Sequence, residues 1–240
     1  MSTILGVKDL SASYGDGNII SDISFEIRAG DIICIVGESG SGKSTLLKAI
    51  HGFDKVQITG GEVVLSGECT LGLVSQNPGG SFNPIRTYKA QIKEALKSNR
   101  IDKNFDEVVK TLKMLGLNDA KRVLESRPYE LSGGMNQRMA IATTMILNPG
   151  LLLCDEVTSA LDVKTARMVV EQLLEINKMK NTAILMVTHH LGIAAKMADN
   201  IGIMKNGKML EYGEADFVLN NPQNEYTKNL LRDVPKLKVG

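Results

Sequence analysis

A glycine-rich segment that follows an apolar run and opens a helical pattern gives the strongest chemical signal. Residues 37–44 read Gly-Glu-Ser-Gly-Ser-Gly-Lys-Ser and match the phosphate-binding pattern G-x-x-x-x-G-K-[ST] at every fixed position. Glycines let backbone N–H groups surround phosphate oxygens, and the N-terminus of the following helix adds positive potential. The pattern therefore predicts a nucleotide-phosphate site, in which Lys43 contacts the terminal phosphates and Ser44 binds Mg²⁺. The residues expected to line it are Gly37, Glu38, Ser39, Gly40, Ser41, Gly42, Lys43, Ser44 and Thr45.

Two adjacent acids, Asp155 and Glu156, come directly after the apolar run Leu151–Cys154. An acid at the carboxyl end of a strand beside a phosphate loop is suited to hold Mg²⁺. The next acid is then placed to orient or deprotonate an attacking water. We expect Asp155 to be a metal residue and Glu156 to be a catalytic one.

A second cradle for an anion is predicted at Ser132-Gly133-Gly134, where small residues open a helical pattern. The phosphate loop already surrounds a triphosphate, so this cradle has no evident role in its own subunit. It makes sense if it contacts the terminal phosphate that is bound to an opposite subunit.

Short apolar runs alternate with helical patterns, as is typical of an α/β domain with a mainly parallel sheet. Ile32–Val36, Leu151–Cys154 and Ala183–Val187 read as buried strands, and residues 201–210 read as a strand pair around a tight turn. A Lys-rich helical stretch in the middle of the chain indicates a helical subdomain, at about residues 86–148, inserted in the α/β core. The whole chain, 1–240, is expected to form a single domain of this kind.

Composition excludes several classes of protein. The 240 residues are 43% hydrophobic, which suits a globular domain with a substantial core. Twenty-eight basic and 27 acidic residues leave a net charge of +1, without the basic surplus typical of nucleic-acid-binding proteins. The apolar runs are too short to cross a membrane, and the first residues show no secretory signal. Three widely spaced cysteines fit reduced thiols better than a disulfide framework.

The motifs and their order resemble those of the ATP-binding cassette (ABC) ATPases, over about residues 3–232. The resemblance implies a P-loop NTPase fold of the ABC type, with a small antiparallel β region and a helical subdomain. It implies that ATP and Mg²⁺ are bound, with Ser132, Gly133, Gly134 and Asp162 acting in trans across a dimer interface. Tyr14 matches the aromatic residue that stacks on adenine. The residues implied to be catalytic are Lys43, Gln76, Glu156 and His189, and those implied to hold Mg²⁺ are Ser44, Gln76 and Asp155.

Within the family, three stretches are similar to the peptide- and nickel-type importers: Ser75–Pro84, Glu130–Arg138 and Asn221–Leu231. The chain is thus expected to be the ATP-hydrolysing subunit of an importer for peptides, nickel or metal chelates. Two positions depart from the family pattern. Val157 replaces a common proline, and His190 replaces a common aspartate.

The resemblance implies several partners and a location. A second cassette would complete a homodimer or heterodimer. Membrane-spanning permease subunits would receive the motion of the two cassettes, and an extracellular solute-binding protein would be an indirect partner. No nucleic acid is expected, and the chain is placed at the cytoplasmic face of the cell membrane as a peripheral subunit. An exporter ATPase subunit, a non-transport ABC ATPase and a cassette that binds ATP without hydrolysing it are the alternatives.

Overall fold

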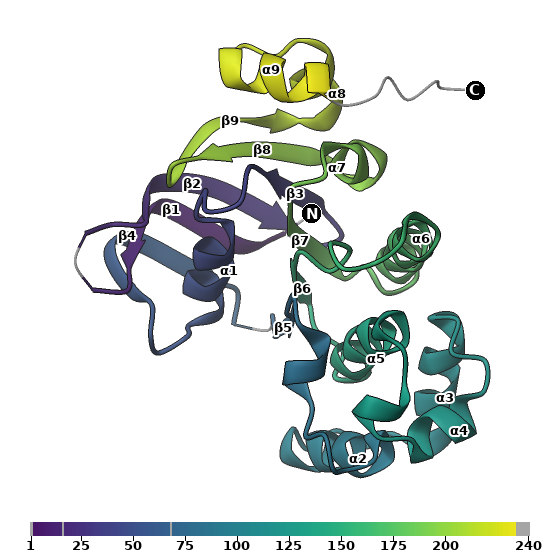
Figure 1. Ribbon diagram of the computed structural model, residues 1–240. Helices are drawn as coiled ribbons and strands as arrows, with labels where there is room; N and C mark the ends of the chain where they lie inside the picture. The colour runs from purple at the N-terminus through teal and green to yellow at the C-terminus, as the bar shows by residue number, and fades with distance from the viewer. Residues whose placement is uncertain (1, 16, 68, 234–240) are drawn as a thin grey trace.

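The computed structural model describes residues 2–15, 17–67 and 69–233 and arranges them as two β-sheets and a group of helices. In Figure 1 the sheets form the upper part of the molecule, and α2 to α5 form the lower part. The polypeptide enters the helical part after β5 and returns to the sheet at β6.

The larger sheet has six strands in the order β5-β6-β7-β3-β8-β9. Its strands are β3 (Ile32–Val36), β5 (Leu71–Val74), β6 (Leu151–Asp155), β7 (Ala183–Thr188), β8 (Asn200–Lys205) and β9 (Lys208–Glu214). The first five in the order pair in parallel, and β9 pairs antiparallel with β8 at the edge. The expected strands and the tight turn between β8 and β9 are confirmed.

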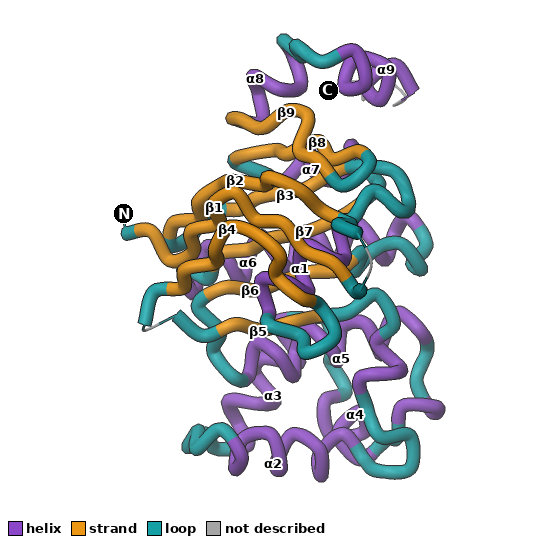
Figure 2. Tube along the Cα trace, turned by 90° about the vertical axis from the view of Figure 1, so that its left-hand side faces the viewer, coloured by secondary structure: helices purple, strands orange, loops and turns teal. Residues whose placement is uncertain are grey.

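The smaller sheet is antiparallel and has the order β2-β1-β4. Its strands are β1 (Thr3–Ser13), β2 (Ile20–Arg28) and β4 (Gln57–Leu65). Figure 2 shows these strands stacked against the larger sheet. A mixed, mainly parallel sheet beside a small antiparallel one confirms the expected fold class.

Helices cover the larger sheet and build the lower part of the molecule. They are α1 (Lys43–His51), α2 (Tyr88–Ser98), α3 (Phe105–Met114), α4 (Ala120–Glu125), α5 (Gly133–Ile146), α6 (Val163–Lys180), α7 (Leu191–Met197), α8 (Ala215–Asn220) and α9 (Glu225–Asp233). Short 3-10 helices occupy Pro78–Ser81 and Pro128–Glu130. Among the described residues, no helix combines the length and the apolar character needed to cross a bilayer.

The central strands are buried on both faces, and successive side chains alternate between two cores. On β3, Ile33 and Ile35 pack in the core shared with α1 and the antiparallel sheet. Cys34 packs on the opposite face, in the core shared with α5, α6 and α7. Burial raises the pKa of the Cys34 thiol to about 12, so this cysteine is a small apolar core residue.

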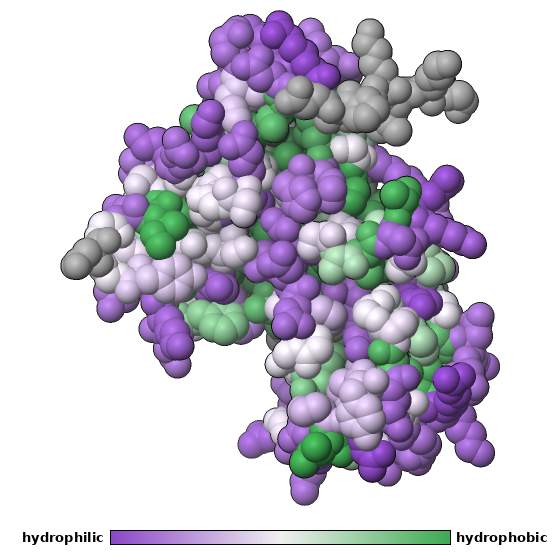
Figure 3. Space-filling model, in the orientation of Figure 1, coloured by the Kyte–Doolittle hydropathy of each residue, from purple (hydrophilic) through white to green (hydrophobic). Residues whose placement is uncertain are grey.

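The surface of the helical part is mainly hydrophilic, with separate hydrophobic patches (Figure 3). Two large apolar side chains are strongly exposed there, Ile85 at 75% and Tyr129 at 68%. The Arg127 Nε donates a hydrogen bond to the Ile85 carbonyl at 3.2 Å, which links the segments that bear them.

Candidate active site

The phosphate loop lies between the end of β3 and the start of α1 and requires glycine at two positions. A Cβ at Gly37 would lie 2.1 Å from the Met204 carbonyl oxygen. Gly42 has a φ of +100°, and a Cβ there would lie 2.7 Å from Cγ2 of Ile20. The loop backbone therefore packs directly against β8 and the start of β2 on one side, where there is no room for side chains.

The Lys43 ammonium is folded back into this loop. It donates hydrogen bonds to the carbonyls of Gly37 at 2.8 Å and Glu38 at 2.7 Å, and the side chain is only 4% exposed. Burial lowers the pKa of Lys43, while the nearby acids Glu156, Asp155 and Glu38 oppose that shift. A buried cation at the centre of a glycine loop is suited to bind phosphate oxygens.

Ser44 and Asp155 bring two oxygen ligands together from α1 and β6. The Ser44 hydroxyl donates to Asp155 Oδ1 at 2.8 Å. Burial raises the pKa of the Asp155 carboxyl, and the Ser44 hydrogen bond acts in the opposite direction. A hydroxyl and a carboxylate are the oxygen donors that Mg²⁺ prefers, so the donor set fits this cation.

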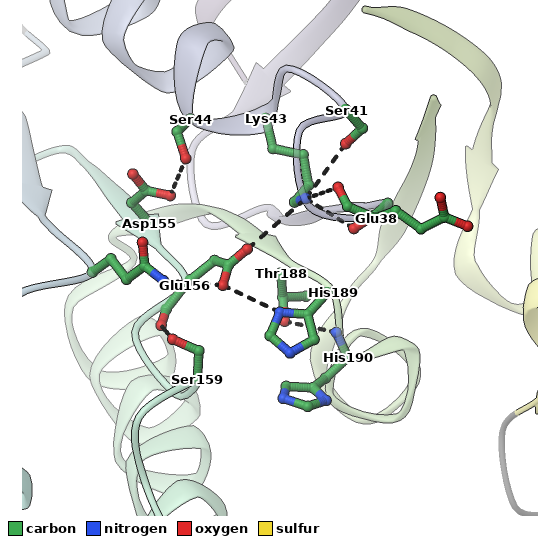
Figure 4. A network of polar contacts seen from close by, with 12 residues as sticks. Glu38, Ser41, Lys43, Ser44, Asp155, Glu156, Ser159, Thr188, His189 and His190 are labelled. Atoms are coloured by element: carbon green, nitrogen blue, oxygen red, sulfur yellow. Dashed lines mark hydrogen bonds and ion pairs between the residues drawn. The ribbon is translucent and has the colours of Figure 1, made fainter. Parts of the chain in front are cut away.

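Glu156 is the centre of the polar network (Figure 4). Its carboxylate lies 3.1 Å from His189 Nδ1, 3.4 Å from Gln76 Nε2 and 3.9 Å from Lys43 Nζ. Its backbone has a φ of +47° and its N–H donates to the Val187 carbonyl at 3.0 Å. A non-glycine residue in this region costs about 1–3 kcal/mol, and such strain is found where a side chain must be aimed.

The His189 ring is placed by the end of β7. The Thr188 hydroxyl accepts a hydrogen bond from the His190 N–H at 3.0 Å, which fixes the turn after the strand. The rings of His189 and His190 lie 3.9 Å apart. Burial, and then the neighbouring His189, lower the pKa of His190, while Glu156 opposes that shift.

One cavity of about 670 Å³ brings most of the predicted residues together. It is lined by Ile19, Gly37, Glu38, Ser39, Gly40, Gly42, Lys43, Ser44, Thr45, Gln76, Glu156, His189 and Leu230. Its size suits a nucleotide-sized ligand. Ile19 and Leu230 were missed by sequence reasoning, because neither belongs to a recognisable motif and both reach the cavity only through tertiary packing.

Seven predicted site residues do not line this cavity: Tyr14, Ser41, Ser132, Gly133, Gly134, Asp155 and Asp162. Tyr14 is 44% exposed with Lys48 Nζ 5.9 Å from its ring centre, and among the described residues it does not line the cavity. Ser132 caps α5 and its hydroxyl accepts the Met135 N–H at 3.3 Å, and Asp162 caps α6. The Ser132-Gly133-Gly134 segment and Asp162 also lie outside this cavity.

A family model for ABC transporters matches residues 20–159. The chain belongs to the ABC transporter family. It is 35% identical over 241 residues to the oligopeptide transport ATP-binding protein OppD of Lactococcus lactis subsp. cremoris, which covers 92% of this chain and 71% of that protein. It is 36% identical over 258 residues to the metal-staphylopine import system ATP-binding protein CntD of Staphylococcus aureus, which covers 98% and 94%.

A solved ABC cassette has the same fold. The dimeric post-hydrolysis structure of MJ0796, bound to ADP and Pi, matches with a TM-score of 0.76 and 26% identity, covering 88% of this chain and 99% of that one. This ABC family chain is therefore an ATPase subunit of the transporter type.

Proposed function

We propose that this ABC subunit hydrolyses ATP between two cassettes and thereby powers an importer for peptides, nickel or metal chelates. The observation that supports this most directly is the convergence of Lys43, Gln76, Glu156 and His189 on one cavity. These residues come from α1, from the loop after β5, and from the ends of β6 and β7. A purely structural nucleotide site would not need a carboxylate aimed at the phosphate end.

The contacts of each side chain support a proposed role for it in hydrolysis. Glu156 orients a water whose oxygen attacks the terminal phosphorus, and the proton of that water passes to the carboxylate as the bond to ADP breaks. Lys43 neutralises charge on the phosphate oxygens. His189, 3.1 Å from Glu156, holds the terminal phosphate and fixes the carboxylate.

A divalent cation fits beside these groups. Ser44, Asp155 and Gln76 provide hydroxyl, carboxylate and amide oxygens of the kind that Mg²⁺ prefers. Bound Mg²⁺ would supply positive charge to the phosphate oxygens. Asp155 is nine-tenths buried, so its charge is compensated better by a cation than by solvent.

A second cassette would complete the site. Ser132 and Gly133 are exposed at the start of α5, and Asp162 is exposed before α6, so these residues are open to a partner. The dimeric cassette structure supports an arrangement in which they act in trans, as a homodimer or a heterodimer. Tyr14 would stack on adenine from the rim of the cavity.

The segment after Gln76 is the proposed contact with the permease subunits. Pro78 and Pro84 stiffen this segment, Phe82 is half-buried, and Ile85 is strongly exposed. Tyr129 adds a second exposed apolar side chain, two residues after Arg127, whose side chain is hydrogen-bonded to the Ile85 carbonyl. A short helix of a membrane subunit is the kind of partner that such a surface binds.

Two named relatives support the importer assignment. OppD is an oligopeptide transport protein and CntD belongs to a metal-staphylopine import system. The chain would then act as a peripheral subunit at the cytoplasmic face of the membrane, with an extracellular solute-binding protein as an indirect partner. Nucleic acid has no role in this proposal.

Purification of the chain from native membranes in mild detergent tests the assembly. We expect permease subunits and a second cassette to accompany it, and the complex to hydrolyse Mg-ATP. Lys43→Met should abolish hydrolysis, while the exposed Lys178→Met is the matched control. Uptake of labelled tripeptides or nickel–histidine into right-side-out vesicles tests direction, and outward transport or a soluble complex with nucleic acid would contradict the proposal.

A further inference from the structure

Tyr88 is a fully buried tyrosine at the first position of α2, and its hydroxyl has a single well-formed partner. The hydroxyl donates to Asn136 Oδ1 at 2.6 Å, and the side chain is 0% exposed. Burial raises the pKa of the Tyr88 phenol, so the hydroxyl remains a neutral donor at physiological pH. Its backbone N–H donates to the Ser126 carbonyl at 3.0 Å, which ties the start of α2 to the end of α4.

Asn136 links this tyrosine to the helix that begins at the Ser132-Gly133-Gly134 cradle. Its Nδ2 donates to the Pro128 carbonyl at 2.9 Å, so the amide is bonded on both sides. Its backbone N–H donates to the Ser132 carbonyl at 2.9 Å. Asn136 therefore lies one helical turn from the residue proposed to bind phosphate in trans.

The other side of Tyr88 faces the segment that follows Gln76. The Phe82 ring packs edge-on against the Tyr88 ring, with centroids 4.8 Å apart and an interplanar angle of 78°. Phe82 ends the short 3-10 helix Pro78–Ser81. A continuous path of direct contacts thus runs from the proposed permease-binding segment through Tyr88 to the start of α5.

We infer that Tyr88 and Asn136 are positioning residues that transmit displacement of the Phe82 segment to the Ser132-Gly133-Gly134 cradle. This inference rests on the proposed function, because it assigns the route by which permease contact orients the trans phosphate site. Core packing alone would be served by phenylalanine at position 88 and an apolar residue at 136. The paired hydroxyl and amide instead select one relative orientation of α2 and α5, because either group would be unsatisfied in another.

Tyr88→Phe is the test, since it removes one oxygen and keeps the ring that packs on Phe82. The measured quantity is the ratio of ATPase rate in the assembled transporter, reconstituted in nanodiscs, to the rate of the unassembled cassettes at saturating Mg-ATP. We expect this ratio to fall about threefold to tenfold, the range for loss of one buried hydrogen bond. The unassembled rate and its KM for ATP should stay within about twofold of wild type. Tyr212→Phe, which removes a tyrosine hydroxyl from β9, outside the permease-binding segment and outside the path from Phe82 to α5, is the matched control.

If thermal unfolding shows that Tyr88→Phe folds poorly, Asn136→Ala is the second variant that tests the inference. In a double-mutant cycle the two substitutions should be non-additive in the assembly ratio, because they remove the same bond. An unchanged ratio in both variants would overturn the inference and leave the proposed function intact. A wild-type chain whose ATPase rate does not respond to assembly would overturn both.

Discussion

Glu156 is held by neighbours from three separate parts of the chain, Lys43, Gln76 and His189, although its backbone lies in a strained region. The backbone conformation and the side-chain contacts together orient the Glu156 carboxylate toward Lys43, Gln76 and His189. Val157, where the family commonly has proline, is 2% exposed and packs in the core. Apolar packing of Val157 therefore stabilises the turn that carries Glu156, the residue that we propose to be catalytic.

The stability of the protein should depend on the charge of Asp155. A carboxyl whose pKa is raised on folding favours the folded state below its unfolded pKa and disfavours it above that pKa. Burial and the like charge of Glu156 raise the pKa of Asp155 against the opposing effects of Ser44, Lys48 and Lys43. Asp155→Asn should therefore raise the midpoint of thermal unfolding at pH 7.

This advantage should shrink as the pH falls through the raised pKa of the folded-state carboxyl, and it should be small near the unfolded pKa of about 3.9, where the folded side chain is mostly protonated. Thermal unfolding without nucleotide or Mg²⁺ at pH 4 and pH 7 is the measurement, with the exposed Asp54→Asn as the control for net charge. A lower midpoint for Asp155→Asn at pH 7 would contradict the prediction. The same variant should lose Mg-dependent ATPase activity.

Tyr14 does not line the cavity, so its proposed contact with adenine has to be tested by nucleotide binding. An aromatic face on adenine contributes about 1 kcal/mol, which corresponds to roughly a fivefold change in affinity. Tyr14→Ala should weaken ATP binding by about that factor and leave the unfolding midpoint nearly unchanged, because the side chain is 44% exposed. Titration calorimetry with ATP measures it, with Tyr129→Ala as the control, and an unchanged Kd would show that Tyr14 does not contact adenine.

At the scale of elements, the segment from Gln76 to α2 contacts both the catalytic network and the helical part. Gln76 bonds Glu156, Phe82 packs on Tyr88, and Ile85 is exposed beside Arg127. Phe82 is half-buried against the core, so Phe82→Asp would disturb folding as well as docking. Ile85 separates these effects better because three-quarters of its surface is exposed.

Ile85→Asp should weaken assembly with the permease subunits and leave ATP hydrolysis by the unassembled chain within about twofold. An exposed apolar side chain contributes little to folding, but a charge in an apolar contact surface is unfavourable for binding. Co-purification yield and ATPase rate measure the two effects. Phe217→Asp, a similar change at an exposed apolar residue of α8, is the matched control. Equal yields for the two variants would exclude Ile85 from the permease contact.

At the scale of the whole molecule, the Ser132-Gly133-Gly134 cradle is not part of the cavity lined by the residues that we propose to be catalytic. The cradle is exposed at the start of α5 in the lower part of Figure 1, whereas the cavity lies beside the phosphate loop and α1. We propose that one chain offers two half-sites, so that two chains placed face to face would pair each cavity with the cradle of the other.

Glu156→Gln keeps the shape of the side chain and removes its charge, so it should block hydrolysis and spare ATP binding. The cassettes should then accumulate as an ATP-bound dimer in size-exclusion chromatography with Mg-ATP. The partner cassette must be present in case the dimer is mixed, and the exposed Glu175→Gln is the control. A Glu156→Gln protein that hydrolyses ATP at the wild-type rate, or a wild-type monomer that is fully active at high dilution, would contradict this prediction.

Features that depend on neighbouring residues could be predicted from the sequence. Alternating and continuous apolar runs predicted β3, β6 and β7, and the pattern of Gly37–Ser44 predicted a loop between a strand and a helix, because both depend on local backbone geometry. Asp155 and Glu156 were recognised for the same reason, as acids at a strand end.

Contacts between residues far apart in the chain depend on the three-dimensional fold. The strand order places β6 and β7 side by side, and this brings Glu156 within 3.1 Å of His189. Packing of α9 and of the start of β2 brings Leu230 and Ile19 to the cavity, and packing of α2 on α5 pairs Tyr88 with Asn136. No local pattern encodes such contacts, because they arise from the order of strands and the fit of helices across many intervening residues.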